Sequence, residues 1–343
     1  MRLAIGGRAS RLLFEAVFLL ASLSLAWPLF VARYVPIQDL PQHVAAVRVL
    51  HDFNVPGLAF ERFFERSLLS TQYLSVYLLA DLLTSALGAL LACKCILAAS
   101  MVGVPFAARK LLAELRQPQS YALFTLPLAY HAHWLLGFIN FVAALPLMLW
   151  GIALAVRWRR QGSRRTGLAL GKLGLVTFYT HVVPFAVLVL ASCMLAVGGT
   201  PRATLRRLWP LLPSAAATAV WLATSPAGHA LLTLAGPGQP HRVPSFATPE
   251  ESLRDLPSWL TDTLVGSSDG WTFVAWLLLC AIALVLGVRE PAHARVCHTR
   301  RASGLRVRVA LLVPLAWAAY FVLPTAYTFI WPINARFPIL ALL

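Results

Sequence analysis

The sequence is short of charge, and of acidic charge in particular. Only 12% of its 343 residues are charged and 59% are hydrophobic, whereas a soluble domain carries roughly 25% charged residues. Apolar residues run together in stretches of about 17–25, each long enough to span a bilayer as a helix. They do not alternate with polar residues as the strands of a membrane barrel would. We therefore expect residues 1–343 to form a single all-α polytopic membrane domain.

Cysteine is scarce, and the common catalytic motifs are missing. There are five cysteines, of which four lie in or near apolar runs, so we expect no disulfide. Cys93 and Cys95 do not have the spacing of zinc ligands. The sequence contains no Walker A, G-x-S-x-G, H-E-x-x-H or Rossmann fingerprint. Chemistry driven by a cytoplasmic nucleotide on this chain is therefore not expected.

The basic residues are concentrated in five short segments between apolar runs. These segments hold 21 of the 29 Lys and Arg and two acids. They are 2–11, 109–116, 157–172, 202–207 and 289–308. Two longer loops, at about 33–67 and 227–270, hold nine of the 13 acids. This is the positive-inside pattern of a membrane protein, so the net charge of +16 does not indicate nucleic-acid binding. It predicts a cytoplasmic N-terminus and two outer loops.

The same rule predicts nine crossings and the start of a tenth. They are expected at about 12–32, 88–108, 119–136, 138–156, 168–181, 183–198, 208–226, 271–288 and 309–326, with the tenth starting near 337. The stretch 68–84 is expected at the outer interface or packed against the bundle. No small-x-small cleavage site follows the first apolar run, which favours an uncleaved anchor. The last apolar run reaches Leu343, which predicts a longer natural chain.

This topology sends most of the polar side chains of the apolar regions to the outer side. They are Asp39, His43, His51, His131, His133, Asn140, His181, His229, His241 and Arg336. Polar groups at membrane depth normally line a cavity or pair with each other. We therefore expect an outward-facing polar cavity. Glu15 and Asp81 lie inside apolar runs as candidate buried acids whose partners the sequence does not identify.

Each outer loop is predicted to carry an amphipathic helix in the membrane interface, at about 40–53 and 249–264. Asp39 with Gln42, and Thr248 with Glu251, have the spacing of capping boxes. Asp39 is thus open to a purely structural interpretation as a helix cap contributing about 1 kcal/mol. His43 lies one turn after Asp39 and could share its side.

The remaining histidines are open to similar alternatives. His131 and His133, at i and i+2 of a helix, would point about 200° apart and would not chelate a metal together. His181 lies where the ends of two crossings meet, which gives it a better claim to line the cavity. A histidine at a helix end is, however, more often a hydrogen-bonded structural group.

Four stretches resemble the GT-C superfamily of integral-membrane glycosyltransferases. They are PIQDLPQHVAAVRVL at 36–50, WLLGFINFVAALPLML at 134–149, TFYTHVVPFAVLVL at 177–190 and INARFPILALL at 333–343. The resemblance covers nearly the whole chain and concerns layout more than a sharp motif. It implies a sugar donor carried on a polyprenyl phosphate, transfer to an acceptor on the non-cytoplasmic face, and a catalytic acid in the first outer loop, in a chain of the bacterial inner membrane.

Asp39 matches that acid by position and is expected to act as the general base, with His43 beside it. Many members of the superfamily have a second acid there, where this chain has Gln38, so metal binding is not supported and no cofactor is expected. Arg suits phosphate because its planar fork binds two oxygens at once. The expected substrate-binding residues are Arg336 first and Arg242 second, with His181, His131 and His133. Arg336 could instead be a snorkelling residue.

Other functions fit the same composition. A transporter or flippase of a lipid or lipid-linked sugar would place polar or broken-helix features near the midplane, often within internal repeats. The sequence shows no repeat, and its polar groups gather on one face, which favours the enzyme. A membrane acyltransferase would need a His/Asp grouping that His131 and His133 do not supply. A structural membrane subunit is a further alternative.

Overall fold

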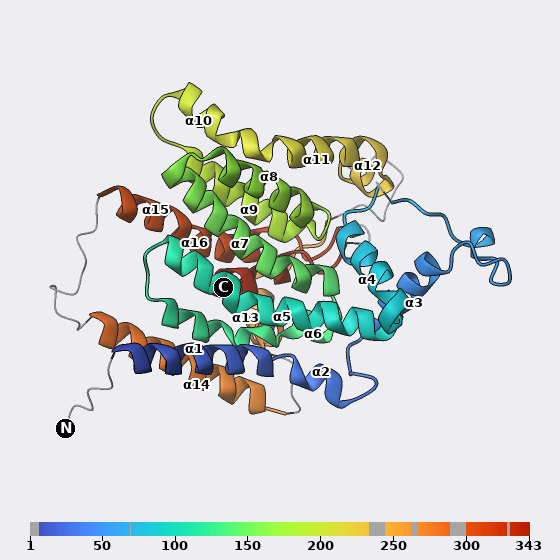
Figure 1. Ribbon diagram of the computed structural model, residues 1–343, viewed down its shortest axis with the longest axis horizontal. Helices are drawn as coiled ribbons and strands as arrows, with labels where there is room; N and C mark the ends of the chain where they lie inside the picture. The colour runs from blue at the N-terminus through green and yellow to red at the C-terminus, as the bar shows by residue number, and fades with distance from the viewer. Residues whose placement is uncertain (1–6, 69, 233–243, 262–265, 289–299, 328–329) are drawn as a thin grey trace.

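The computed structural model describes residues 7–68, 70–232, 244–261, 266–288, 300–327 and 330–343, and within these ranges the chain is helical, without a β-strand (Figure 1). The first half holds α1 (Gly7–Ser24), α2 (Trp27–Val31), α3 (Leu40–His51), α4 (Leu74–Leu87), α5 (Ala89–Glu114), α6 (Ala132–Leu135) and α7 (Ile139–Gln161). The second half holds α8 (Arg164–Phe178), α9 (Val182–Ala196), α10 (Pro201–Leu208), α11 (Leu212–Thr224), α12 (Pro226–Leu232), α13 (Pro249–Leu260), α14 (Ser268–Val288), α15 (Arg300–Ala310), α16 (Leu312–Val322) and α17 (Phe337–Leu342).

Helices α5 and α7 form the centre of the bundle, with α4, α8 and α9 packed around them. Small residues allow these helices to approach one another closely. A Cβ at Gly103 would lie 3.1 Å from Pro146, and one at Gly151 would lie 2.7 Å from Leu188. Membrane helices associate through such small-residue contacts because lipid supplies little hydrophobic drive between them.

Among the described residues, three helical stretches are long and apolar enough to cross a membrane: Ala89–Glu114, Ile139–Gln161 and Gly304–Val322. At about 1.5 Å per residue, the 26 residues of α5 exceed the roughly 30 Å thickness of the hydrocarbon core. The expected all-α membrane class therefore agrees with the structure. The larger number of crossings expected from the sequence is not reached by helices of this length.

Several predicted crossings are broken at prolines. The stretch 119–136 is not one helix but the short turns η2 (Gln119–Thr125) and η3 (Pro127–Ala129) followed by α6. Pro127 has no N–H to donate and its ring crowds the preceding turn, so it ends the helical ladder. The first crossing is likewise divided into α1 and α2 just before Pro28. Prediction of single continuous helices in these two stretches was wrong.

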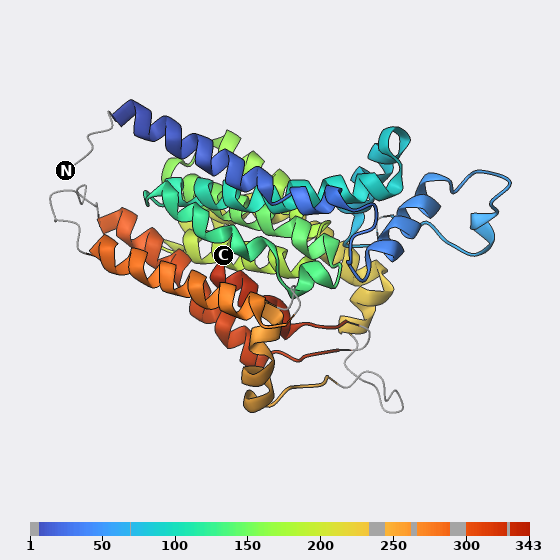
Figure 2. The same ribbon diagram turned by 90° about the horizontal axis from the view of Figure 1, so that it is seen from below.

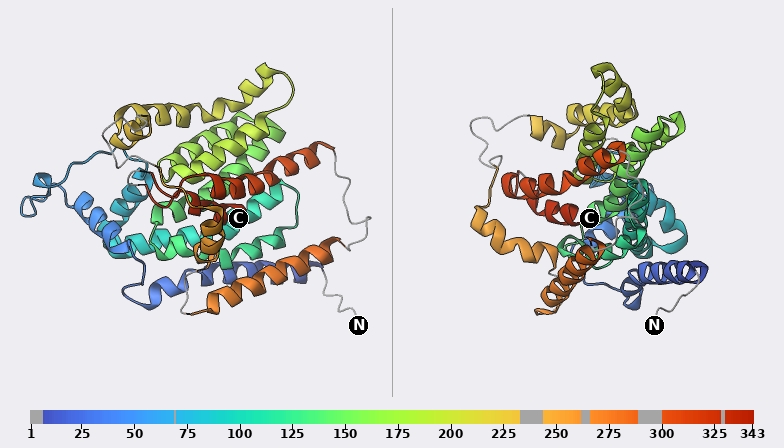
Figure 3. Two further views of the ribbon diagram at one scale, coloured as in Figure 1. Left: turned by 180° about the vertical axis from the view of Figure 1, so that it is seen from behind. Right: turned by 90° about the vertical axis from the view of Figure 1, so that its left-hand side faces the viewer.

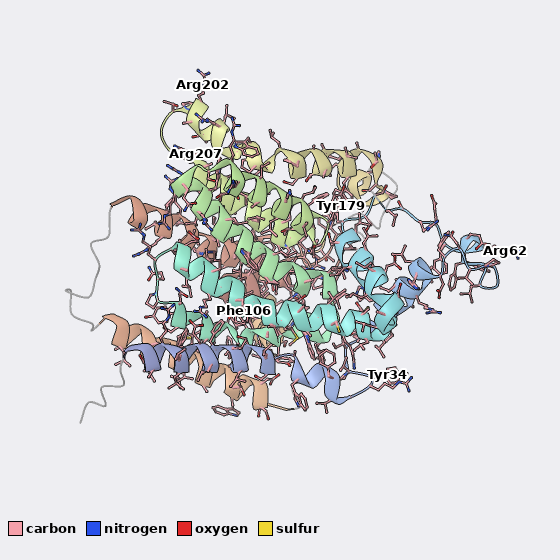
Figure 4. The ribbon with its side chains drawn as sticks, in the orientation of Figure 1. Tyr34, Arg62, Phe106, Tyr179, Arg202 and Arg207 are labelled. Carbon is pink, nitrogen blue, oxygen red and sulfur yellow. The ribbon has the colours of Figure 1, made fainter. Side chains whose placement is uncertain are left out.

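The two ends of the bundle differ in charge. Figure 1 places α10, α15 and the start of α1 at one end, and α2, α3, α4 and α12 at the other. Figure 4 labels Arg202 and Arg207 at the first end and Tyr34 and Tyr179 toward the second. We call them the basic end (described residues of 109–116, 157–165, 202–207 and 306–308) and the polar end (36–43, 131–138, 181 and 334–336).

The two expected helices form; the first is shorter than predicted, and the predicted residues 262–264 of the second lie outside the described residues. Helix α3 covers Leu40–His51 and α13 covers Pro249–Leu260. The Thr248–Glu251 capping box is present in both directions. Figures 2 and 3 show α13 crossing the direction of the long helices. The Tyr320 hydroxyl of α16 fixes it there by donating to the Ser252 carbonyl at 2.6 Å.

The two candidate buried acids have partners, and neither is fully buried. Glu15 accepts two hydrogen bonds from Arg109 of α5, at 2.7 and 2.5 Å. Asp81 accepts from His51 Nδ1 at 2.7 Å. The second pair joins α3 to α4. Residues 74–87 pack against α5 of the bundle, one of the two positions expected for this stretch. Both acids therefore have structural roles.

Candidate functional site

The polar end is built around the loop 134–138, on which the start of α3 docks. The Asp39 N–H donates to the Leu136 carbonyl at 3.1 Å, and the Gln38 N–H donates to that of Leu135 at 2.9 Å. Gly137 has φ +86°, and a Cβ there would lie 2.7 Å from the Asp39 nitrogen. Position 137 thus requires glycine for both its backbone conformation and the close approach. This contact fixes Asp39 against the loop.

Asp39 precedes the first residue of α3, but its side chain makes no capping hydrogen bond. The expected Asp39–Gln42 capping box is therefore wrong. The reason is local: Asp39 has φ −90° and ψ −1°, whereas a capping residue typically has an extended backbone that turns its side chain toward the N–H groups of the first turn. The partly exposed carboxylate is left available for other chemistry.

The His43 imidazole is held by hydrogen bonds at both of its ring nitrogens. Its Nδ1 lies 2.7 Å from the Tyr77 hydroxyl and its Nε2 lies 3.0 Å from the Gly137 carbonyl. Because a carbonyl only accepts, Nε2 carries the proton and Nδ1 accepts from Tyr77. Burial lowers the pKa of His43, while the Gly137 carbonyl and then the Asp39 charge act in the opposite direction. A neutral His43 thus ties α3, α4 and the loop together.

His131 and His133 lie close together, contrary to the geometry expected for one helix. His131 has an extended backbone (φ −148°, ψ 167°) and precedes α6, whereas His133 lies inside it. Their ring centroids are 5.5 Å apart. Both side chains are buried, and none of their four ring nitrogens has a hydrogen-bond partner among the described residues. Such groups normally face a ligand, water or ion.

Arg336 brings a buried positive charge to the same place. It lies in η7 (Asn334–Arg336), its side chain is 6% exposed, and its guanidinium lies 5.5 Å from the Phe138 ring centroid. Its charge acts on His133 and His181. Within the described part of the chain it forms no ion pair, and its Nε has no hydrogen-bond partner. A buried charge without a counter-ion is costly, so this position suits an anion.

A series of aromatic contacts joins these groups. The ring centroid of His133 lies 5.7 Å from that of Trp259 and 5.1 Å from that of Phe141. The ring centroids of Phe141 and His181 are 5.4 Å apart. His181 begins α9, and its Nδ1 accepts from the Val183 N–H. Trp259 belongs to α13, so α13 packs against the cluster. The sequence predicted this helix as a cover for the cavity, with Trp259 beside its apolar stripe, but it did not identify Trp259 as a residue of the site.

The structure thus brings together four of the expected substrate-binding residues, which we call the histidine–arginine cluster. Its members are His131, His133, His181 and Arg336. Asp39 and the cluster contact the same loop. Asp39 contacts its residues Leu136 and Gly137, and Arg336 lies over its residue Phe138. The expectation of one cavity reached by both Asp39 and Arg336 is not borne out directly. A cavity of about 490 Å³ at this end is lined by their neighbours Pro36, Trp134 and Leu260 instead.

Other expected residues lie elsewhere. His51 pairs with Asp81, and His229 Nε2 contacts the Ala223 carbonyl at 2.7 Å. Arg242 and His241 fall outside the described residues. Asn140 is buried near the cluster, and its Oδ1 has no hydrogen-bond partner there. Across the ranges that the structure describes, no group of three or more His, Cys, Asp or Glu could hold a metal ion.

Comparison with known proteins adds no assignment. No protein-family model matches the chain, and neither a curated protein nor a solved structure matches it. The geometry of the polar end is therefore what an account of function has to start from.

Proposed function

We propose that this protein is a membrane glycosyltransferase of the GT-C type. It transfers a sugar from a polyprenyl-phosphate donor to an acceptor hydroxyl on the non-cytoplasmic face, with Asp39 as the general base. The observation that carries the proposal is the histidine–arginine cluster. In it a buried Arg336 without a described acid partner acts electrostatically on His133 and His181, and His131 lies against His133. The loop 134–138 connects this cluster to Asp39, an acid whose side chain does not cap α3.

The reaction needs positive charge on one side of the sugar and a base on the other. The bond between the anomeric carbon and the phosphate oxygen breaks, and the phosphate leaves with the electron pair. Arg336 stabilises that charge, since guanidinium binds phosphate oxygens with two parallel hydrogen bonds. The acceptor oxygen forms the new bond to the anomeric carbon as Asp39 takes its proton. No metal is required in this scheme.

The neighbouring residues support these two roles. His43 positions the start of α3, because it joins Tyr77 to the Gly137 carbonyl. Neutral His131 and His133 each offer one ring donor and one acceptor. His181 offers a donor at Nε2, because its Nδ1 accepts from Val183. These groups suit phosphate oxygens and sugar hydroxyls. Trp259 offers an aromatic face to the sugar, and the cavity of about 490 Å³ beside Trp134 suits the first prenyl units.

The proposal includes the topology inferred from charge: a cytoplasmic N-terminus, nine to ten crossings, and both amphipathic helices outside, in a bacterial inner membrane. The separation of the basic and polar ends supports it. Cysteines introduced at the exposed positions Ala45 and Ser245, in a background without the native cysteines, test it. We expect labelling by an impermeant reagent in intact cells. Labelling only after lysis would reverse the orientation and remove the site from the outer face.

The activity test should not depend on knowing the acceptor. Purified protein is incubated with polyprenyl-phosphate hexoses, and release of polyprenyl phosphate is followed by mass spectrometry, which detects transfer to any acceptor or to water. We expect release by the wild type and none by Asp39→Asn. Asp81→Asn is the matched control, because Asp81 is an acid at the same end with a structural partner. Equal release by Asp39→Asn and wild type would remove the general base.

One observation favours the transporter alternative. The segment 119–135 is a run of short turns between long helices, and transporters use broken helices around their binding sites. A flippase would move the intact lipid-linked sugar across a liposome membrane and leave the sugar–phosphate bond unbroken. Translocation without release of polyprenyl phosphate would establish that alternative over the enzyme.

A further inference from the structure

An apolar cavity of about 620 Å³ lies away from the proposed active site, in the half of the bundle toward the basic end. One wall comes from α5, α7 and α9, and the other from α14, α16 and α17. Figures 2 and 3 show these two groups of helices on opposite sides of this region. Residues that face the cavity include Leu111, Ile152, Leu190, Trp276, Ala319 and Leu340. The cavity is within the range of roughly 300–1,000 Å³ typical of small-molecule sites.

The surroundings of the cavity indicate a lipid ligand. All three stretches that are long and apolar enough to cross a membrane contribute to its lining. A cavity between helices that span a bilayer lies at the depth of the hydrocarbon core. Its polar lining is sparse and includes Gln117 and Arg306, both toward the basic end. The ligand that fits is therefore a long apolar chain whose polar group lies at that end.

Two arginines near the polar part of the cavity lining indicate which lipid headgroup binds. Arg306 donates to the Leu115 carbonyl at 2.8 Å and to the Arg116 carbonyl at 3.0 Å, which fixes its guanidinium beside the end of α5. Arg160 approaches the same helix end, with Nη1 3.0 Å from the Glu114 carbonyl. Arginines in this position attract anionic lipid headgroups of the adjoining leaflet.

We propose that this cavity binds an acyl chain of an anionic phospholipid from the leaflet at the basic end, with its phosphate beside Arg306 and Gln117. The site is separate from the proposed donor site, whose phosphate partner Arg336 lies at the polar end. The inference does not depend on the proposed enzymatic function. The two sites share one element, since Phe337 follows Arg336 directly and lines the cavity.

Native mass spectrometry of purified protein offered equal amounts of phosphatidylglycerol and phosphatidylcholine tests the proposal. We expect the wild type to retain one phosphatidylglycerol, about tenfold in preference to phosphatidylcholine. Ala319→Phe, which fills the cavity, should reduce retention about tenfold. Ala318→Phe is the matched control, because Ala318 lies next along α16, is exposed and does not line the cavity. Arg306→Gln should keep chain binding and lose the preference for the anionic headgroup.

Val187→Phe fills the cavity from α9 and is measured in parallel, with thermal unfolding, so that a folding failure of one variant does not decide the result. Equal retention of phosphatidylglycerol by folded filling variants and wild type would overturn the proposal, as would equal retention of the two lipids by the wild type. Displacement of bound phosphatidylglycerol by equimolar polyprenyl phosphate would assign the cavity to the donor chain instead. None of these outcomes bears on whether Asp39 is a base.

Discussion

The arginines at the two ends of the bundle have different partners. At the basic end, Arg207 donates to the carbonyls of Ala196 and Gly198, and Arg308 donates to those of Met194 and Val197. These carbonyls belong to the C-terminus of α9, where a helix lacks internal donors and its dipole favours positive charge. At the polar end, Arg336 is more deeply buried, and its Nε has no hydrogen-bond acceptor among the described residues.

For Arg207 and Arg308 on one side and Arg336 on the other, the difference separates structural from functional charge. A guanidinium that satisfies the carbonyls of a helix end stabilises the fold whether or not a ligand binds. A buried guanidinium without an acceptor destabilises the fold unless an anion arrives. Burial also lowers the pKa of Arg336, which shows that its surroundings disfavour the charge they contain. Local strain of this kind is typical of binding sites.

The largest expected effect concerns Asp39. Asp39→Asn keeps the size of the side chain but cannot accept the proton, so transfer should fall by about 10²–10⁴-fold, the usual contribution of a general base. The rate of polyprenyl-phosphate release measures this. The thermal unfolding midpoint should stay unchanged, because the Asp39 side chain makes no capping bond. A lowered midpoint with parallel loss of activity would mean that Asp39 acts through the fold.

The next effect concerns donor binding. Arg336→Ala removes the charged partner of the phosphate, which contributes roughly 1.5–3 kcal/mol for hydrogen bonds to charged groups, or about 10–150-fold in affinity. Titration with polyprenyl phosphate measures this. Arg254→Ala is the control, because Arg254 is exposed and pairs with its neighbour Asp255. Unchanged affinity in Arg336→Ala would show that the phosphate lies elsewhere.

A pair of stability measurements tests whether Arg308 and Arg336 differ in this way. Arg308→Met leaves the Met194 and Val197 carbonyls without their donor and should destabilise the protein by about 1–3 kcal/mol. Arg336→Met removes an uncompensated charge and should leave the ligand-free protein equally stable or more stable. Thermal unfolding of both variants in the same detergent measures the difference. Destabilisation of similar size in both would mean that Arg336 also has a structural role.

The smallest effect is a pH dependence through His43. Its pKa is lower in the folded protein than in the unfolded chain because of burial, so the unfolded state binds more protons as pH falls below about 6.5. The contribution of neutral His43 to stability is therefore complete above that pH and is lost progressively below it. His43→Gln should flatten the fall of the unfolding midpoint between pH 7 and 5. An unchanged slope would show that His43 does not titrate on unfolding.

The sequence predicted well wherever the signal was local. The apolar stripes after Asp39 and Thr248 predicted two helices, and both form. Helix α3 ends two residues earlier than predicted, and α13 is described as far as Leu260, with the predicted residues 262–264 outside the described ranges. Thr248 caps as predicted because its backbone is extended (ψ 159°), whereas Asp39 does not because its backbone is helical. Both fit the same pattern of residue types. The capping hydrogen bond is decided by backbone dihedrals, which depend on how Gln38 and Asp39 dock on residues 135–137.

The candidate site likewise depends on contacts that local sequence patterns do not predict. The expectation that His131 and His133 point apart assumed one continuous helix, and the proline-broken stretch before α6 invalidated that assumption. Glu15 and Asp81 were recognised as acids in apolar runs, but their partners Arg109 and His51 lie 94 and 30 residues away in sequence. No periodicity in the sequence reports a pairing across such separations.

Composition by itself determined that this chain is helical and built for a membrane, because runs of apolar residues without charge satisfy their backbone in lipid only as helices. The charge pattern also determined which residues gather at each end. The tertiary structure decided that Arg308 meets helix carbonyls. It also decided that Arg336 lies near His133, His181 and Phe138, and that Trp259 packs against His133. Residue type fixes what a side chain can donate or accept, but only packing fixes whether its partner is present.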